Sequence, residues 1–503
     1  MSKYKVEIFL YHYKNIIQYK KKGSIKISKN YRYVKNILPP FILNKIEHYN
    51  INKFNKKEDR WMPILDNFDS QFINIASELE NGLMSSYDKT KLDSILLDDI
   101  DYITNELQDL KDHMEEQFIY GIKIDTTNPN QNDCVTYTDD SATYQPLKVN
   151  QTTGECSYGS WKNIIDNILG VTPCLVKNTG QTLIKLNPDD YTKTIDGNSI
   201  DIESGEFGQV MIRFNHIYYK FSVEDKYIRF QISNKRIDNT WIDTVFASED
   251  GIGTIKNYMY ISAYEAVQKN NILQSVSNGL PSFKLSYEQI EKLTEFGVFH
   301  MMNIIKKQFV TFLGYLVTKS IDLQGNIGNG NITGEVLKTG TMNDKGLFYG
   351  KNNTIEGVKL FGIENLWGNQ LKYMHGIIQK LVHNLNIETG MIEDEQHIFT
   401  KEFFPYNKIE DFNDCGKIEP NTYGYISSIR FLTNSIYLPD KLDGSSTTYY
   451  NSYFQNGESN DSSHKLYGIY GGNKKYTDKT GSEFLLLGYI DPEYNDATTH
   501  LIY

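Results

Sequence analysis

The sequence has few cysteines, and their spacing argues against the common cysteine-based sites. Four occur in 503 residues, Cys134, Cys156, Cys174 and Cys415, and no two form a CxxC pair. This spacing disfavours a structural zinc site, and so low a number disfavours a disulfide scaffold. A disulfide between Cys156 and Cys174 is compatible with the sequence, but free buried thiols are favoured.

Secretion and membrane signals are also lacking. The N-terminal run MSKYKVEIFLYHYKN has no uninterrupted apolar region and no small-residue cleavage site, so we expect no signal peptide. The most apolar stretch, residues 296–317, is broken by His300, Lys306 and Lys307 and is too polar to span a bilayer. We therefore expect a soluble protein without membrane insertion.

The sequence has no excess of positive charge. The net charge is −11 and the pI is near 5.5, whereas phosphate binding needs clustered Lys and Arg. We therefore expect no nucleic-acid partner. Proline is sparse, with 12 residues, and tyrosine is abundant, with 37. Tyrosine suits exposed recognition surfaces, although a low-GC genome accounts for the same bias equally well.

Catalytic patterns are absent as well. The sequence has no G-x-S-x-G elbow, and residues 325–341 lack the G-x4-G-K-[ST] order of a phosphate-binding loop. Acidic residues are too scattered to single out a glycosidase pair. The tripeptide Glu419-Pro420-Asn421 matches the calcium site of sugar-binding C-type lectins, but no WND follows it, and short matches arise by chance. We expect no catalytic residue, cofactor or metal ion.

The N-terminal residues 1–58 are basic, with a Lys-rich cluster at 20–29. A small anchoring module that docks on a larger assembly would have this composition, and so would the solvated face of an ordinary domain. The prediction adopted for residues 1–58 is the anchoring module.

Residues 59–118 show helical periodicity. Six apolar residues recur at spacings that alternate between four and three, as in the a/d seam of a coiled coil: Leu96, Ile100, Ile103, Leu107, Leu110 and Met114. About three heptads are marginal alone, so this helix is expected to pack against other copies of the chain. An amphipathic helix in an intrachain bundle has the same pattern.

Residues 119–256 are predicted to be β-rich. Alternating runs at 181–186, 210–223 and 226–232 are separated by turn clusters such as ESGEFG at 203–208. One helix is predicted at 160–169, with Gly170 as its C-terminal cap. In the last predicted domain, 257–503, the pattern is helical at 257–277 and again at 286–320. The second helix begins with Ser286 and Gln289 in a capping-box arrangement.

The rest of the chain is organised around the run FGIENLWGN at 361–369. The aromatic residues Phe361, Trp367 and Tyr373 alternate there with Gly368 and Asn369. Glycine permits left-handed backbone, and Asn tolerates it better than most residues. This spacing predicts a tight turn in which the tryptophan side chain is buried in the core.

Three segments resemble one protein family. The run at 361–369 with Tyr373 and Gly376 resembles the signature of the C-type-lectin-like, formylglycine-generating-enzyme-like domains at the tips of bacteriophage tail fibres. YGIKIDTTNPNQNDCVTYTD at 120–139 and VMIRFNHIYYKFSV at 210–223 resemble two further segments of the same phage proteins, in the same order. The resemblance covers roughly residues 120–503. Leu371, Lys372 and Met374 depart from the family's pattern.

The resemblance implies a lectin-like fold and, for the seam at 96–114, a homotrimer. It also implies that the C-terminal segment carries the receptor-binding surface. Formylglycine-generating chemistry is not expected, because no two cysteines lie close together in the C-terminal half. His375 and His383 stand eight apart without the glutamate that an iron-binding branch requires.

Aromatic side chains set among Ser, Asn and Gly in the C-terminal segment are the predicted receptor contacts. Aromatic faces can stack on sugar rings, and Ser and Asn can bond hydroxyl groups. Period-two strand geometry would send about half of these rings into the core, so the prediction concerns the set as a whole: Tyr449, Tyr450, Tyr453, Phe454, Tyr467, Tyr470 and Tyr476.

These observations predict an α+β multidomain chain. It would have an N-terminal anchoring module, a helical coiled-coil stalk, a β-rich middle and a C-type-lectin-like adhesin domain. The predicted function is a non-enzymatic tail-fibre or receptor-binding protein of a phage or phage-tail-like virion, docked on the baseplate or tail and binding a host glycan or protein. The alternatives are a surface-polysaccharide depolymerase and a structural baseplate or tail protein.

Overall fold

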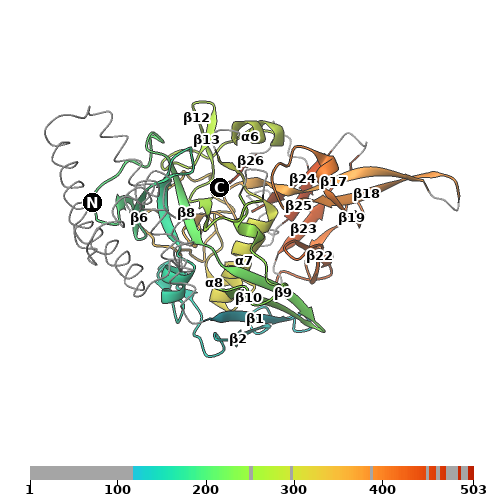
Figure 1. Cartoon of the computed structure of the whole chain (residues 1–503), viewed down its shortest axis with the longest axis horizontal. Coiled ribbons are helices and arrows are strands. Elements are labelled where there is room, and N and C mark those ends of the chain that lie inside the picture. Colours follow the sequence, from blue (N-terminus) through green and yellow to red (C-terminus); the bar gives the residue numbers. More distant parts are fainter. Residues whose placement is uncertain are drawn as a thin grey trace, which may run out of the picture. The chain divides into compact units, whose positions relative to one another are not determined.

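The computed structural model describes residues 117–248, 253–294, 298–385, 389–448, 452–459, 465–471, 485–488 and 497–503. All of them belong to one compact unit, Asp109–Tyr503. Strands predominate in these residues, and three larger sheets surround a buried helix (Figure 1).

A four-stranded antiparallel sheet lies at one edge of this unit (Figure 1). Its order is β2-β1-β10-β9, with bounds β1 Ile119–Asp125, β2 Val135–Asp139, β9 Tyr218–Glu224 and β10 Tyr227–Ser233. In β10, buried residues alternate with partly exposed ones, which is the pattern of a sheet with one covered face.

A seven-stranded sheet has the order β14-β27-β11-β8-β5-β6-β7. It joins strands from both sides of residue 257, the predicted domain boundary. Its bounds are β5 Thr172–Val176, β6 Thr182–Asn187, β7 Asp190–Thr194, β8 Gln209–Asn215, β11 Tyr258–Ser262, β14 His300–Met301 and β27 Leu501–Ile502.

The third sheet has the order β19-β18-β17-β24-β25-β23-β20, with β26 also pairing with β17. Its strands β17 and β18 extend from the unit as a long hairpin (Figure 1). The bounds are β17 Leu371–Leu385, β18 Ile392–Thr400, β19 Asn413–Lys417, β20 Tyr423–Tyr425, β23 Tyr453–Asn456, β24 Lys465–Tyr470, β25 Leu485–Gly488 and β26 Ala497–Thr498.

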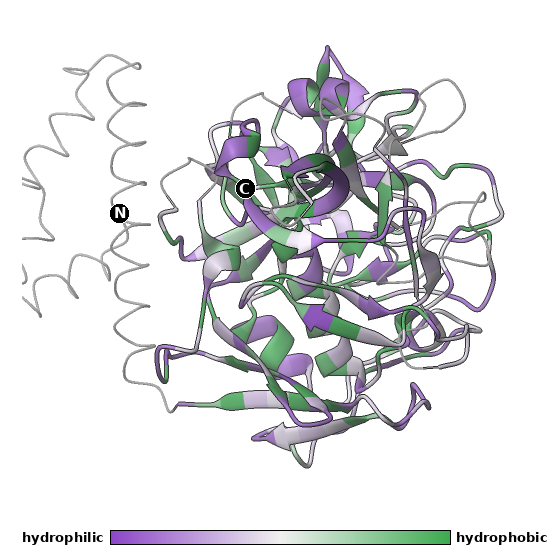
Figure 2. Ribbon diagram, turned by 90° about the vertical axis from the view of Figure 1, so that its right-hand side faces the viewer, coloured by the Kyte–Doolittle hydropathy of each residue, from purple (hydrophilic) through white to green (hydrophobic). Residues whose placement is uncertain are grey.

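The helix α7, Ile304–Thr318, forms the centre of the core. All fifteen of its residues are buried, as expected of a helix that is packed on every side. Phe312 contacts Phe221 and Phe230 of the four-stranded sheet, and Gln308 Nε2 donates to Tyr437 O. In Figure 2, hydrophobic segments lie mainly on strands and helices inside the unit.

Short elements complete the described residues. The hairpin β12–β13 and the helix α6 lie at the edge opposite the four-stranded sheet (Figure 1). The bounds are β3 Lys148–Val149, β4 Cys156–Ser157, η1 Ile164–Ile168, η2 Thr244–Phe246, β12 Val267–Lys269, β13 Ile272–Gln274, α6 Tyr287–Thr294, α8 Leu323–Asn326, β15 Lys359–Leu360, β16 Ile363–Glu364, η3 Ile409–Asp411, β21 Ser428–Phe431 and β22 Tyr437–Lys441.

The predicted α+β multidomain architecture with a helical stalk is wrong. Strands predominate, and no helical stalk occurs in the described part of the chain. The helix predicted at 257–277 is instead β11, β12 and β13. The strand β11 is covered on both faces, with four consecutive buried residues, so its apolar residues do not alternate and resemble a buried helix. The second predicted helix, at 286–320, is instead three elements: α6, β14 and α7. The seam from Leu96 to Met114 and the module at 1–58 lie outside the described residues.

Other local predictions are confirmed. Strands occur at 182–187, 209–215, 218–224 and 227–233, close to the predicted runs. Ser286 N–H donates to Gln289 Oε1 at 2.8 Å, and Gln289 N–H donates to Ser286 Oγ at 3.3 Å, which is the predicted capping box. All four cysteines are free thiols.

A separate finding concerns the helices: none within the described ranges is both long and apolar enough to cross a membrane.

Candidate functional site

An open polar depression lies beside the β12–β13 hairpin. Its volume is about 600 Å³, within the ~300–1,000 Å³ range of small-ligand sites. One wall comes from the loop between β7 and β8, and the other from residues 267–269 and 276–279. The lining residues are Asp201, Glu203, Ser204, Val267, Gln268, Lys269, Val276, Ser277, Asn278 and Gly279. A second cavity, between α7 and β22, measures about 10 Å³, which is room for about one water.

Direct hydrogen bonds hold the two walls together. Ser277 N–H donates to Ile202 O at 2.9 Å. The Lys269 ammonium donates to Glu203 O at 3.0 Å and to Ser204 O at 2.7 Å. The shape of the depression is therefore fixed by the protein itself, so a ligand would not have to order it.

The first wall is itself a tight turn built on Asp201. Its Oδ1 accepts from the N–H groups of Glu203 at 2.8 Å and Ser204 at 3.1 Å. Hydrogen bonds from the Ser204 side chain and from these two N–H groups hold the pKa of the Asp201 carboxyl below its usual value. Asp201 is therefore ionised at neutral pH and faces the depression as an anion.

A glycine brings this turn close to a buried amide. Gly205 has φ +77°, and a Cβ there would lie 2.5 Å from Gln274 Oε1 and 3.3 Å from Val276 Cγ1. Gln274 is only 6 % exposed, and its Oε1 has no hydrogen-bond partner. Buried polar atoms without a partner are rare enough to require an explanation. The unpartnered oxygen lies under Gly205, and Gln274 is not among the residues that line the depression.

The second wall is bonded to Thr339, and the adjacent Gly340 is bonded to Glu364 of the run at 361–369. Asn278 N–H donates to Thr339 O at 2.8 Å, and Thr339 N–H donates to Gly279 O at 2.9 Å. The next residue, Gly340, donates its N–H to Glu364 Oε2 at 2.9 Å. Burial raises the pKa of the Glu364 carboxyl to about 7, because the charged form loses its hydration.

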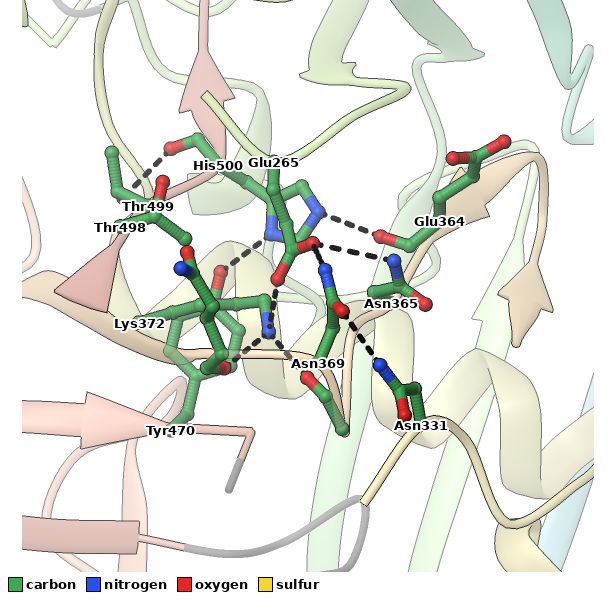
Figure 3. Close-up of polar contacts among 12 residues, drawn as sticks. Glu265, Asn331, Glu364, Asn365, Asn369, Lys372, Tyr470, Thr498, Thr499 and His500 are labelled. Carbon is green, nitrogen blue, oxygen red and sulfur yellow. Dashed lines mark hydrogen bonds and ion pairs between the residues drawn. The ribbon is translucent and has the colours of Figure 1, made fainter. Parts of the chain in front are cut away.

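A buried ion pair lies at the centre of this support (Figure 3). Lys372 Nζ is 2.9 Å from Glu265 Oε1, and the two side chains are 0 % and 1 % exposed. Glu265 Oε2 accepts from Asn365 Nδ2 at 3.2 Å and also from Asn369 Nδ2. Because Glu265 lies two residues before Val267, this network fixes the base of the β12–β13 hairpin.

Hydrogen bonds link this network to residues earlier and later in the sequence. Asn369 Oδ1 accepts from Asn331 Nδ2 at 3.0 Å and from Leu337 N–H at 2.8 Å. His500 Nε2 lies 2.9 Å from Glu364 O, and its Nδ1 lies 2.9 Å from the Tyr470 hydroxyl (Figure 3). Burial lowers the pKa of His500 to about 3, so this imidazole is neutral. The network is structural, because it has no open side in contact with solvent.

Apolar side chains stand exposed on the loops that form the depression. Phe207 is 47 % exposed and follows the first wall, and Leu280 and Phe283 are 52 % and 53 % exposed and follow the second. None of these three lines the depression, but they add exposed apolar surface on the same loops. The polar side chains of the depression can bond the hydroxyl groups of a sugar.

The structure describes four of the seven predicted receptor contacts and places three of them in the core. Tyr453, Phe454 and Tyr470 are 5 %, 3 % and 0 % exposed, so their rings do not meet solvent. The Tyr467 ring stacks on Tyr287 with centroids 3.6 Å apart, and its hydroxyl donates to Glu288 Oε1 at 2.9 Å. Tyr449, Tyr450 and Tyr476 lie outside the described residues.

The five residues predicted as the core of the organising stretch are all buried. Phe361, Trp367 and Tyr373 are at most 1 % exposed. Phe361, Gly368 and Asn369 have φ of 50°, 76° and 61°, as the predicted tight turn requires. Trp367 Nε1 donates to Gly328 O at 3.0 Å, which satisfies its polar atom inside the core.

The depression itself was not predicted from the sequence. Its only local signal was the turn cluster ESGEFG at 203–208, which contains Gly205 and Phe207. No group of three or more potential ligands is placed to hold a metal ion in the described residues. No protein-family model matches the chain, and a search of curated proteins found no match.

Proposed function

We propose that this chain is a non-enzymatic attachment protein that binds a glycan on a host cell surface through the depression. The setting would be the virion of a phage or phage-tail-like particle, as the resemblance of three segments to tail-fibre tip proteins implies. The observation that carries the proposal is the preformed depression of about 600 Å³ with exposed aromatic rings on its loops.

Several copies of such a shallow site on one particle would bind more tightly than a single copy. A single open site gives modest affinity, but several copies on one particle raise the overall avidity by about 10²–10⁴ without a new contact. We therefore propose a homo-oligomer, with three copies as in the resembling fibres, docked on a baseplate or tail by its N-terminal region.

Blocking the depression tests the proposal. Gln268 lines the depression and is exposed on β12, so Gln268→Trp should fill the opening and retain the strand. The matched control is Glu224→Trp, at an exposed position of β9. Labelled full-length protein is incubated with isolated cell walls from a panel of bacteria. We expect wild type and Glu224→Trp to adsorb and Gln268→Trp to lose adsorption. Equal adsorption of all three would refute the site, and no adsorption to any wall would favour a structural role.

One observation favours a depolymerase as the second candidate. Asp201 and Glu203 both line the depression, and paired carboxylates are the usual machinery of glycoside hydrolysis. The lowered pKa of Asp201 disfavours it as the general acid, so the test is made on Glu203. Release of soluble reducing sugar from walls, abolished by Glu203→Gln, would establish this alternative.

A further inference from the structure

We propose that the depression selects a glycan with free amino groups, so that its ligand is an amino sugar whose nitrogen is not acetylated. This inference rests on the proposed glycan-binding function and names the ligand class of the same site. It follows from the charges and the acceptors that face the depression.

Asp201 and Glu203 are exposed acidic residues of the lining, whereas its one ammonium is hydrogen-bonded to the wall. Asp201 and Glu203 line the depression, and hydrogen bonding keeps Asp201 ionised. The hydrogen bonds of Lys269 Nζ go to the main-chain carbonyls of Glu203 and Ser204. A ligand in the depression therefore meets negative charge, which attracts an ammonium group and repels phosphate or carboxylate.

The orientation of Glu203 is set by its neighbours. Asn278 Nδ2 donates to Glu203 Oε2 at 3.3 Å, while Lys338 Nζ donates to Asn278 Oδ1 at 3.2 Å. This chain of contacts directs the amide donor of Asn278 toward the carboxylate. Because an ionised carboxylate offers about four acceptor sites, Glu203 keeps capacity for a ligand donor.

Charge on the whole chain favours the same ligand class. With a net charge of −11, the protein would repel anionic wall polymers at long range. A bridging divalent cation would be another way to use two carboxylates, but no third ligand joins them among the described residues.

The test uses full-length protein and two matched sets of oligosaccharides. One is a β-linked glucosamine oligomer with free amines, and the other is the same oligomer fully N-acetylated. Binding is measured by calorimetry at a pH where the amines are protonated, at low and high salt, with and without EDTA. We expect the free-amine oligomer to bind about tenfold more tightly, which corresponds to about 1.4 kcal/mol. Salt should reduce this preference, and EDTA should have no effect.

Two variants and one control test whether the preference for the free-amine oligomer comes from the depression. Asp201→Asn keeps the turn, because Asn also forms it, and Glu203→Gln keeps the shape of the side chain. Each should weaken free-amine binding by roughly fivefold, the upper range for an exposed charge pair. Glu155→Gln is the control, since Glu155 is also exposed and its Oε2 also accepts one bond at 3.3 Å, from Thr153.

The outcomes separate this inference from the proposed function. Equal or tighter binding of the acetylated oligomer, or loss of binding in EDTA, would overturn the amino-sugar inference. If cell-wall adsorption still required an open depression, the glycan-binding function would stand. If neither walls nor oligomers bound, the proposed function would fail. Equal effects of Glu203→Gln and Glu155→Gln would also overturn the assignment to this depression.

Discussion

Breaking the ion pair between Glu265 and Lys372 should destabilise the protein strongly. The ammonium is 2.9 Å from Glu265 Oε1 and also donates to Gly368 O at 3.0 Å and Gln370 O at 2.7 Å. Both side chains are fully buried. Replacing either one leaves the other as an unpaired buried charge, and losses of about 3–5 kcal/mol are typical of that situation.

The perturbations are Lys372→Met, Glu265→Gln and the double substitution. We expect each single variant to lower the free energy of unfolding by about 3–5 kcal/mol. The double variant should lose clearly less than the sum of the two, because it leaves neither charge unpaired. The measurement is urea unfolding followed by fluorescence, with the midpoint and slope compared between variants.

A surface pair supplies the control. Lys345 Nζ is 3.1 Å from Asp344 Oδ2, with 39 % and 66 % of the two side chains exposed. Lys345→Met should therefore cost no more than about 1 kcal/mol. The reasoning is refuted if Lys372→Met is as mild as this control, or if the losses of the two single variants add fully in the double variant.

Three further predictions concern stability. Gly368→Ala should lower the free energy of unfolding by more than ~1 kcal/mol, because φ is +76° and the new Cβ would lie 2.9 Å from Asn331 N; urea unfolding measures it, and an unchanged midpoint would contradict it. Ser286→Ala should cost about 1 kcal/mol by removing the α6 cap, whereas Ser286→Thr should cost less in the same assay. Burial lowers the pKa of His375 and His500 to about 3, so the unfolded chain binds more protons as the pH falls through 6.5. Each histidine should therefore lower stability by about 2 kcal/mol between pH 7 and pH 5. Glu364, whose pKa is raised to about 7, offsets only part of this loss because it takes up a proton in the folded state over the same range. A flat pH profile over that range would contradict the neutral buried state.

Sequence patterns predicted several strands correctly. The run near 226–232 alternates apolar and polar residues and is the strand β10, which has one covered face. The run at 210–223 was also predicted as strand, although β8 within it has four consecutive buried residues. The capping box at Ser286 was readable because it depends on residues three apart. Gly368 and Asn369 were informative because few other residues tolerate positive φ.

The patterns failed in two other strands that are covered on both faces, β11 and β23. In β11 consecutive apolar residues give no period-two signal, and helix was predicted. In β23 the adjacent residues Tyr453 and Phe454 point to opposite faces, yet both are buried. Their placement depends on neighbouring strands far away in the sequence.

The candidate site could not be read from the sequence for the same reason. Its walls are separated by more than sixty residues, and contacts such as Ser277 N–H to Ile202 O bring them together. Composition suggested a tyrosine-rich contact surface in the C-terminal segment. The depression is instead lined by amide, hydroxyl and charged side chains, with phenylalanines on the adjoining loops.

Hydrogen exchange of the full-length chain, with and without soluble glycan released from an adsorbing cell wall, tests the central claim most directly. Backbone exchange reports local protection without any substitution. The account predicts slower exchange at residues 201–208 and 267–280 when the glycan is present, with the projecting β17–β18 hairpin unchanged. Unchanged exchange in both wall segments under saturating glycan, or protection confined to other parts of the chain, would contradict it.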